Sequence, residues 1–470
     1  MPKPVVRYND FIAVNRRSAA PPPGRTLRAG QAEPGTARGE TSGKSMAEIK
    51  PFRALRYTAK AGDIAALTCP PYDIIGEDER LAYLDENPHN VVRLELPKGE
   101  DPYAGAGKTL KDWLADGILR RDTDPGLYLY EEEFEAYGVR KKVKGFVCLV
   151  KLEEFSKGVV LPHEETLSKA KEDRFRLMEA TGCNFSQIYS LYMDEAHTTG
   201  ARLDALSSGR PRYEFSNGTV THRLWIVNDP EAMGAICADF EHRKLYIADG
   251  HHRYETALNY RDRRRELGVA AGGEDYVMMM LVDMEHDGLV VFPTHRLVRG
   301  LKNFNAERLL ASCAERFDVA REDAIGTIES KLNALYTQGK KAFAFYAGGE
   351  GWALLVLKDP AVMKDVLPGR SDAYRGLDVS VLHSLILEKY LGIDRENMAK
   401  QVNLTYTRSF AEAVESVRSG ESQCAFILNP TRVAEIRDVA AAGEKMPQKS
   451  TYFYPKLVTG LVMNQLHEIN

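Results

Sequence analysis

The sequence predicts a mixed α+β protein with more than one domain. Segments of strand character alternate along the chain with segments of helical periodicity. Asn217-Gly218 and Asp287-Gly288 lie between strand-like segments, and such dipeptides are strong signals of a β-hairpin. Residues 406–441 follow a helix–strand–helix order, which is typical of an α/β packing unit. The 470 residues are enough for two or three domains.

The composition is that of an ordinary globular protein and narrows the possible partners. Hydrophobic residues make up 44% of the chain, charged residues 28%, and the formal net charge is -4. This weakly acidic balance gives no general attraction to nucleic acid or to an anionic membrane. We therefore expect a small-molecule ligand and no nucleic-acid or membrane partner, whereas the oligomeric state is not predicted.

The cysteines and the apolar runs indicate a cytoplasmic protein. The six cysteines are scattered and include no CxxC pair, which suits a reduced compartment better than a zinc site or a disulfide framework. The longest apolar runs, such as residues 276–282, are far shorter than the ~18 residues of a membrane-spanning helix.

Residues 1–45 differ from the rest of the chain. They are rich in Pro, Gly, Ser and Thr, lack apolar periodicity, and contain eight Lys/Arg against three Asp/Glu. An acidic-poor, Arg-bearing start could be a transit peptide. Because no amphipathic helix is evident, we favour a disordered extension, with Met46 opening the first domain.

Residues 46–300 are expected to form the first domain, a phosphate-binding catalytic domain. A stiff proline loop, Cys69–Asp73, presents Tyr72 and Asp73 either as a binding wall or as a plain structural corner. Gly107-Lys108-Thr109 lacks the leading glycine and spacing of a Walker loop, so we reject that interpretation. Strands are predicted at residues 91–96, 126–131, 142–151, 159–162, 188–193, 212–216, 219–227, 245–248, 276–284 and 289–298. Helices are predicted at residues 104–115, 167–178, 230–240 and from about 251.

Residues 301–445 are expected to form a C-terminal α/β domain, and residues 446–470 a loop and helix that pack back on the site. Predicted helices are residues 305–317, 325–337, 379–390, 406–418 and 431–441, and predicted strands are 341–346, 352–357 and 423–428. A final helix is predicted from Leu457.

The chemically richest stretch is Leu245–Ala257, read as strand, tight turn and helix. The turn Asp249-Gly250-His251-His252 then lies at a helix N-terminus, where free backbone N–H groups favour an anion. Gly250 lets the backbone approach closely, and Arg253 can fork onto phosphate oxygens. The alternative is an ordinary strand–helix turn capped by Asp249; two adjacent histidines followed by an arginine favour a functional site.

Several other segments carry candidate anion-binding or acid–base residues. Glu164 and Glu165 follow a strand end. Lys171 and Arg174 share a helix face, either for phosphate contact or as a solvated face paired to neighbouring carboxylates. His295 and Arg296 are further candidates for the phosphate or nucleotide site, but neighbouring residues of a strand point to opposite faces, so only one of the two is expected to reach it. Lys449, Tyr452 and Lys456 on a constrained loop are also candidates for this site.

An ordered set of motifs resembles the bacterial and archaeal domain-of-unknown-function family 1015. The motifs are Cys69-Pro-Pro-Tyr-Asp73, Asn90-Val-Val-Arg93, Pro162-His-Glu-Glu-Thr166, Asp249-Gly-His-His-Arg253, Thr294-His-Arg296 and Lys449-Ser-Thr-Tyr-Phe-Tyr-Pro-Lys456. The resemblance runs from about Met46 to the C-terminus, and adds Arg93 and His163 to Tyr72 and Asp73 as substrate-binding candidates. The family name assigns no activity, although its members are associated with serine and phosphoserine metabolism.

The turn by itself resembles the phosphate-binding turn of ParB/sulfiredoxin-type folds, which free-serine kinases share. The resemblance implies a ParB/sulfiredoxin-like core of hairpins and short helices, with a glutamate as base toward the serine hydroxyl. Glu164 or Glu165 is the candidate base, Asp249 and His251 are catalytic candidates, and Asp249 is a possible Mg²⁺ ligand. The motif around the two glutamates departs from the kinase pattern.

These observations lead to the hypothesis of a small-molecule kinase that acts on free L-serine with ATP, ADP or pyrophosphate as donor. Phosphoryl transfer needs positioning, charge neutralisation and a base near the acceptor. One alternative is a phosphoserine phosphatase that uses the same site, and another is a ParB-like nucleotide-binding protein without turnover. A histidine-ligated transition metal is a further possibility, without supporting spacing such as HExxH.

Overall fold

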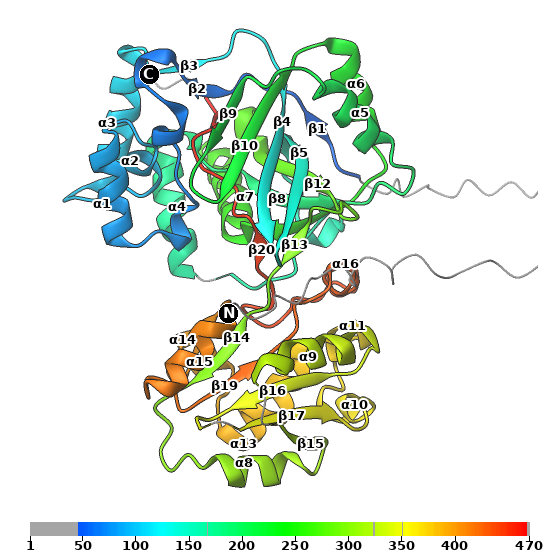
Figure 1. Ribbon diagram of the computed structural model, residues 1–470. Helices are drawn as coiled ribbons and strands as arrows, with labels where there is room; N and C mark the ends of the chain where they lie inside the picture. The colour runs from blue at the N-terminus through cyan, green and yellow to red at the C-terminus, as the bar shows by residue number, and fades with distance from the viewer. Residues whose placement is uncertain (1–45, 167, 323–324, 350, 468–470) are drawn as a thin grey trace, which may run out of the picture.

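The computed structural model describes residues 46–166, 168–322, 325–349 and 351–467 and shows a mixed α/β protein built on two main sheets (Figure 1). The extension predicted for residues 1–45 lies outside the described residues. Within the part of the chain that is described, no helix has both the length and the apolar character needed to cross a membrane.

The larger sheet has nine strands in the order β6-β11-β8-β12-β5-β4-β10-β9, with β1 paired to β5. Two pairs, β6–β11 and β8–β12, are parallel and the others are antiparallel. Its strands are β1 Ile49–Lys50, β4 Leu127–Ala136, β5 Val139–Lys151, β6 Val160–Leu161, β8 Ile188–Tyr192, β9 Tyr213–Ser216, β10 Val220–Val227, β11 Leu245–Asp249 and β12 Tyr276–Asp283. A separate short pair is β2 Leu55–Tyr57 with β3 Leu119–Arg121.

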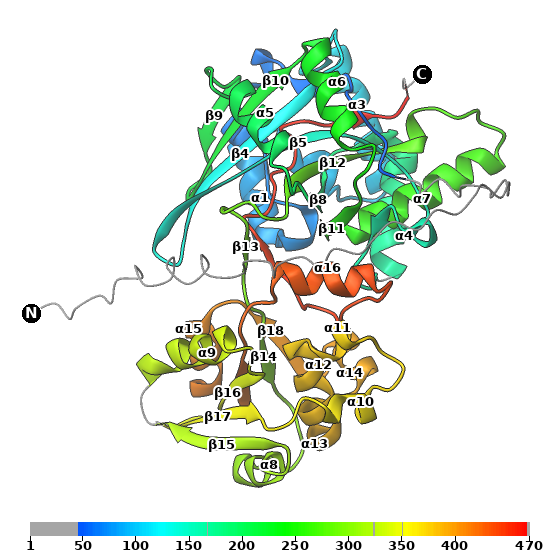
Figure 2. The same cartoon turned by 90° about the vertical axis from the view of Figure 1, so that its right-hand side faces the viewer.

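Helices cover this sheet and place the chemically rich turn at its edge. They are α1 Glu77–Glu86, α2 Val92–Glu95, α3 Pro102–Ala115, α4 Ser168–Thr181, α5 Thr198–Leu206, α6 Pro230–Asp239 and α7 His251–Glu266. Helix α7 packs beside α4 (Figure 2), and Tyr254, Ala257 and Leu258 of α7 are buried in one hydrophobic cluster with residues of β8, β11 and β12. This packing fixes where α7 begins, directly after β11.

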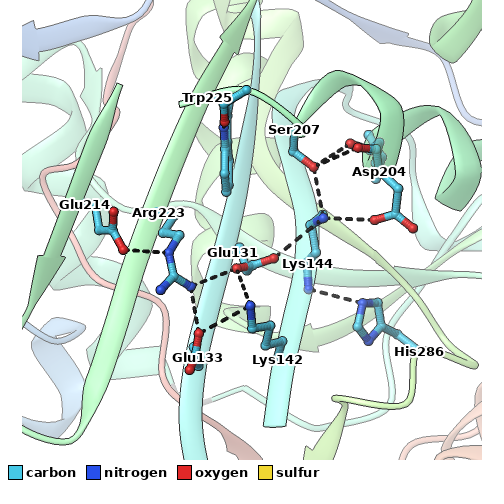
Figure 3. A network of polar contacts seen from close by, with 12 residues as sticks. Glu131, Glu133, Lys142, Lys144, Asp204, Ser207, Glu214, Arg223, Trp225 and His286 are labelled. Carbon is cyan, nitrogen blue, oxygen red and sulfur yellow. Dashed lines mark hydrogen bonds and ion pairs between the residues drawn. The ribbon is translucent and has the colours of Figure 1, made fainter. Parts of the chain in front are cut away.

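One end of the sheet carries a network of charged side chains in place of apolar ones (Figure 3). Arg223 of β10 donates to Glu131 and Glu133 of β4 at 2.9 and 2.8 Å, and Lys142 and Lys144 of β5 complete the pairs. Alternate residues of a strand share a face, so these charges lie on one side of the sheet. Cross-strand pairs of opposite charge of this kind stabilise the register.

The smaller sheet is formed by an excursion of the chain, residues 295–428, which we call the insert. Its strand order is β15-β17-β16-β19-β14-β18, and every pair is antiparallel. The strands are β14 His295–Val298, β15 Phe317–Glu322, β16 Ala342–Tyr346, β17 Trp352–Leu357, β18 Leu404–Thr407 and β19 Cys424–Ile427. The helices of the insert and its return are α8 Ala306–Cys313, α9 Ile328–Thr337, α10 Val362–Val366, α11 Asp372–Arg375, α12 Asp378–Leu382, α13 Lys389–Leu391, α14 Arg395–Lys400, α15 Phe410–Arg418 and α16 Val433–Ala441.

The chain enters and leaves the insert at one place. Strand β13 (Val290–Val291) pairs with β20 (Phe453–Tyr454), which follows the insert in the sequence (Figure 1). The two connections therefore lie side by side at the junction between the larger sheet and the insert.

The hairpin predicted across Asp287-Gly288 is wrong. Residues 286–289 do form a turn, but β12 pairs with β5 and β8, whereas β13 pairs with β20. A Cβ atom on Gly288 would lie 1.6 Å from the Lys142 carbonyl oxygen. Glycine is required there because two backbones approach closely, a tertiary contact that a dipeptide signal cannot reveal.

Two other predicted elements are also wrong. The strand predicted at residues 91–96 is the short helix α2, because the Asn90 side chain accepts from the Val92 N–H at 2.9 Å and turns the chain. The helix predicted from Leu457 is an extended segment instead. Its backbone pairs with Cys69 through Thr459 and with Leu55 through Met463, and β21 (Asn464–Gln465) pairs with β7 (Cys183–Asn184). A continuous apolar run does not distinguish a buried strand from a buried helix.

Candidate functional site

A cavity of about 290 Å³ lies where the larger sheet meets the insert. The lining comes from four parts of the chain: the proline loop, the segment after β6, the turn before α7, and the insert with its return segment. The lining residues are Tyr72, Asp73, Ile74, Glu164, Glu165, Asp249, Gly250, His251, His252, Arg253, Thr294, Gln401, Thr405, Tyr406, Thr407, Arg408, Lys449, Thr451, Tyr452 and Lys456.

The turn between β11 and α7 forms one wall of the cavity. Gly250 precedes the first residue of α7 with φ 95°, a left-handed conformation that glycine adopts without strain. An added Cβ atom would lie 2.9 Å from Nε and Nη2 of Arg253. The glycine therefore serves both the backbone conformation and the packing of the arginine, while the free N–H groups of α7 begin at the cavity wall.

Three charges meet at this turn. Asp249 Oδ2 accepts from Arg253 Nη2 at 2.8 Å, and Asp249 Oδ1 pairs with Lys456 of the return segment. Burial alone would raise the pKa of Asp249, but the two cations outweigh it and hold the pKa well below its ordinary value. Burial lowers the pKa of Lys456 less than Asp249 raises it, so the amine stays charged. Two cations thus share one carboxylate, and the group has a net positive charge.

His251 of the turn and His163 behind it are neutral. Burial lowers the pKa of His163 to about 4 and that of His251 well below its ordinary value. His163 Nδ1 donates to the Ile247 carbonyl at 2.7 Å, its Nε2 lies 3.0 Å from the Thr451 hydroxyl, and its backbone N–H donates to His251 Nε2 at 3.1 Å. The proton of His251 therefore resides on Nδ1. His163 is buried behind the turn and orders it, and it does not line the cavity as a substrate-binding residue would.

His252 lines the cavity beside Asp73. Burial, the largest cause, lowers the pKa of His252, although Asp73 and Glu255 act in the opposite direction. A neutral imidazole here can donate or accept a hydrogen bond to a ligand without adding charge.

The two candidate glutamates differ in their surroundings. Glu164 accepts a long hydrogen bond, 3.4 Å, from the Lys449 N–H, and burial raises its pKa although the Lys449 charge lowers it. Glu165 forms an ion pair with Arg395 of α14, whose side chain is largely exposed. Glu164 is the better candidate for a general base, because its carboxylate forms no ion pair among the described residues and its pKa is shifted toward neutrality.

The cations predicted on α4 do not reach the cavity. Lys171 pairs with Glu255 at 2.7 Å, and Arg174 donates to the Glu95 carbonyl and to Asp173. The guanidinium of Arg174 lies 4.0 Å from the centre of the Tyr72 ring, so it supports the wall from behind. Of the two alternatives that the sequence left open, the structure shows pairing with carboxylates, Asp173 for Arg174 and Glu255 for Lys171.

Arg93, His295 and Arg296 also lie outside the lining. Arg93 donates to the Pro88 carbonyl on the surface, and His295 accepts from the Leu428 N–H inside the insert. Arg296 is fully buried and donates to the carbonyls of Thr294 and Lys449. These two carbonyls belong to the two connections of the insert, so Arg296 joins the connections directly behind the cavity wall.

The insert contributes residues that the sequence interpretation missed. Thr405, Tyr406, Thr407 and Arg408 line the cavity from β18 and the turn after it, whereas the sequence predicted a helix from residue 406. The helix α15 begins only at Phe410, after the cap Ser409. The pairing of β18 with β14 makes the segment a strand, and only the alternation of Thr405 and Thr407 could have suggested it.

In the described residues, no cluster of three or more His, Cys, Asp or Glu side chains could hold a metal ion. Asp249, the predicted Mg²⁺ ligand, has both carboxylate oxygens engaged by Lys456 and Arg253. The donor set therefore does not fit a metal ion held by the protein.

Comparison with known proteins places the chain in a family. The profile of the family described as "Protein of unknown function (DUF1015)" matches residues 49–380, which is well over half of the chain. Among curated proteins, none matches significantly.

Several solved structures are distantly similar. Free serine kinase in complex with AMP is 13% identical with a TM-score of 0.34, covering 68% of this chain and 91% of that chain. C-terminally truncated SbnI from Staphylococcus aureus is 12% identical with a TM-score of 0.33, covering 67% and 86%. A conserved hypothetical protein from Pyrococcus furiosus is 14% identical with a TM-score of 0.31, covering 65% and 90%. TM-scores below 0.5 are too low to establish a shared fold.

Proposed function

The chain belongs to the DUF1015 family, and we propose that it is a small-molecule kinase that transfers a phosphoryl group to the hydroxyl of free L-serine. The proposal includes a ParB/sulfiredoxin-like core, and its main support is the group formed by Asp249, Lys456 and Arg253 at the start of α7. One carboxylate between two buried cations leaves a positive charge beside the free N–H groups of a helix. An anion such as a phosphoryl group neutralises that charge and satisfies those donors.

Glu164 is the proposed base. In the reaction, Glu164 takes the proton of the serine hydroxyl, and the hydroxyl oxygen forms a bond to the terminal phosphorus of the donor. The bond from that phosphorus to its bridging oxygen breaks, and the shortened donor leaves with the electron pair. Lys456, Arg253 and the α7 amides hold the equatorial oxygens, where charge is spread in the transition state.

The size of the cavity and the resemblance of the turn to that of free-serine kinases support serine as the acceptor. A cavity of about 290 Å³ suits small ligands. ATP, ADP and pyrophosphate are all candidate donors. A divalent cation would enter bound to the donor's own phosphates, which is how Mg²⁺ usually binds in such sites.

The proposal is tested with the full chain, L-serine and each donor in turn. We expect O-phosphoserine to form with at least one donor, measured by ³¹P NMR and mass spectrometry. Phosphate release from O-phosphoserine without any acceptor nucleotide would indicate the phosphatase instead. If neither product forms while nucleotide binds, the chain is a binding protein and the kinase proposal is wrong.

The two glutamates provide a matched pair of variants. Glu164→Gln is expected to lower kcat by about 100-fold or more, which is the usual contribution of a general base. Glu165→Gln is expected to change kcat by only a few fold, because it removes an exposed ion pair with Arg395. Equal losses in the two variants, or a larger loss in Glu165→Gln, would show that Glu164 is not the base.

A further inference from the structure

Arg408 of the insert lines the cavity wall and its guanidinium lies over an aromatic ring. Its guanidinium carbon lies 3.7 Å from the centre of the Tyr452 ring. On the backbone side, the Thr407 hydroxyl donates to Glu412 and accepts from the Ser409 N–H, which fixes the turn before α15. Tyr452 is fixed as well, because its carbonyl accepts from the Phe292 N–H at 2.8 Å. The guanidinium therefore has one face covered by the Tyr452 ring.

The described part of the chain supplies no counter-charge to Arg408. Within the described ranges, no carboxylate forms an ion pair with it. Four acidic residues line the cavity. Asp249 is held by two cations and Glu165 by Arg395, and neither Asp73 nor Glu164 forms an ion pair with Arg408 among the described residues. A stacked guanidinium presents its N–H groups at the edge of its plane, and this planar fork matches a carboxylate with two parallel hydrogen bonds.

The distance from Arg408 to the proposed phosphoryl site fits a small hydroxy acid. Lys456 Nζ lies 4.6 Å from the centre of the same Tyr452 ring. The guanidinium carbon of Arg408 and Nζ of Lys456 are therefore separated by at most the sum of their two distances to the Tyr452 ring centre. A three-carbon hydroxy amino acid is short enough to place its hydroxyl near Lys456 and its carboxylate at Arg408.

We propose that Arg408, stacked on Tyr452, binds the carboxylate of the acceptor and thereby selects small hydroxy acids over amino alcohols. This inference rests on the proposed function, since it assigns the second end of the same ligand. We assign Arg408 to the carboxylate of the acceptor and not to a phosphate of ATP, ADP or pyrophosphate. Lys456, Arg253 and the α7 amides already supply hydrogen-bond donors to the phosphate oxygens.

The inference can be tested by binding, without turnover. O-phospho-L-serine and O-phosphoethanolamine share a phosphate and an amine and differ by one carboxylate. In calorimetry, the wild-type chain is expected to bind O-phospho-L-serine about 10- to 100-fold more tightly, the loss typical of a charged hydrogen-bonded pair. Arg408→Ala is expected to bind both ligands with the weaker affinity, and Arg408→Lys to restore only part of the difference.

Arg321→Ala is the matched control, because Arg321 of the insert forms only an exposed pair with Glu307. It should leave both affinities unchanged. Equal weakening of both ligands by Arg408→Ala would place Arg408 on the phosphate and overturn the inference. The inference also fails if the wild-type chain binds the two ligands equally, or binds neither. If the protein binds O-phospho-L-serine more tightly than O-phosphoethanolamine but forms no O-phosphoserine, the kinase proposal is wrong and the carboxylate site at Arg408 still holds.

Discussion

Glu132 lies on the face of β4 opposite the charged network of Figure 3, and it has no exposed surface. The Tyr130 hydroxyl lies 3.0 Å from Glu132 Oε1 and 2.7 Å from His222 Nδ1, whereas Glu132 Oε2 has no hydrogen-bond partner among the described residues. Burial raises the pKa of Glu132 from 4.5 to about 8, and burial lowers that of His222 to about 4. At neutral pH both side chains are therefore uncharged.

This carboxyl makes stability depend on pH with a definite sign. The native state retains a proton that the unfolded chain releases, so stability falls as pH rises from 4.5 to about 8. At pH 7 the cost is roughly 3 kcal/mol by linkage. Glu132→Gln removes it, and we expect the variant to be more stable than wild type at pH 7, with a difference that vanishes near pH 4.5. Urea denaturation between pH 5 and 8 measures the effect.

Glu133→Gln is the control for Glu132→Gln, one residue away on the charged face. The hydrogen bond from Arg223 is the main cause that lowers the pKa of Glu133. Its contribution to stability is present at neutral pH and lost in acid, so Glu133→Gln should be less stable than wild type at pH 7. A loss of stability in both variants would contradict the assignment of a neutral Glu132.

At the scale of single elements, the turn before α7 is the part most directly specified by local sequence. Asp249-Gly250 breaks the strand, and the helical spacing that follows begins α7 at His251. Local reasoning reached less far on α4, where the sequence left Lys171 and Arg174 open between phosphate contact and pairing with neighbouring carboxylates. Arg174 does pair with its neighbour Asp173 at 2.6 Å, whereas Lys171 pairs with Glu255 of α7, a contact decided by the packing of α4 beside α7 and not by spacing within the helix.

Gly250→Ala tests the turn, and Gly268→Ala at the other end of α7 is its control. Both glycines have positive φ, 95° and 77°, so each substitution costs roughly 1–2 kcal/mol of backbone strain. Only at Gly250 does the new methyl meet another group, the Arg253 guanidinium; around Gly268 there is open space. We expect similar decreases in Tm for the two variants, with weaker O-phosphoserine binding, by 10-fold or more, in Gly250→Ala alone. Unchanged O-phosphoserine binding in Gly250→Ala would show that Arg253 does not contact the ligand.

At the scale of the whole molecule, Arg296 joins the two connections of the insert. Its charge is buried without a carboxylate partner among the described residues, and burial lowers its pKa to about 10. Arg296→Met removes a costly buried charge but also leaves the carbonyls of Thr294 and Lys449 without their donor. These effects oppose each other in stability, so we expect a small change in Tm.

The binding site should respond more strongly to Arg296→Met, because the segment that carries Lys449 and Tyr452 is released. We expect faster hydrogen exchange in residues 449–452 and at least a 10-fold loss of O-phosphoserine affinity. Arg299 is an exposed arginine directly after β14, the strand that carries Arg296. The control variant Arg299→Met should therefore show neither effect. Unaltered exchange in residues 449–452 would mean that Arg296 does not hold them.

The contribution of the insert to the cavity is what sequence reasoning could least supply. Lys449, Tyr452 and Lys456 were recognisable as a polar loop, but Arg408 gains significance only when β18 pairs with β14 and turns toward Tyr452. The mixed α/β class followed from strand and helix periodicity, which is local. The pairing of β13 with β20 across the insert is not local, and no short motif encodes it.

The late position of β20 has a consequence for synthesis. A ribosome that has made everything up to β18 has produced the turn, the proline loop and the first connection, yet neither Lys456 nor the partner strand of β13 exists. Asp249 then faces Arg253 alone. Chains that stop before Lys456 consequently lack one of the two cations proposed to hold the phosphoryl group, and we expect them not to bind O-phosphoserine.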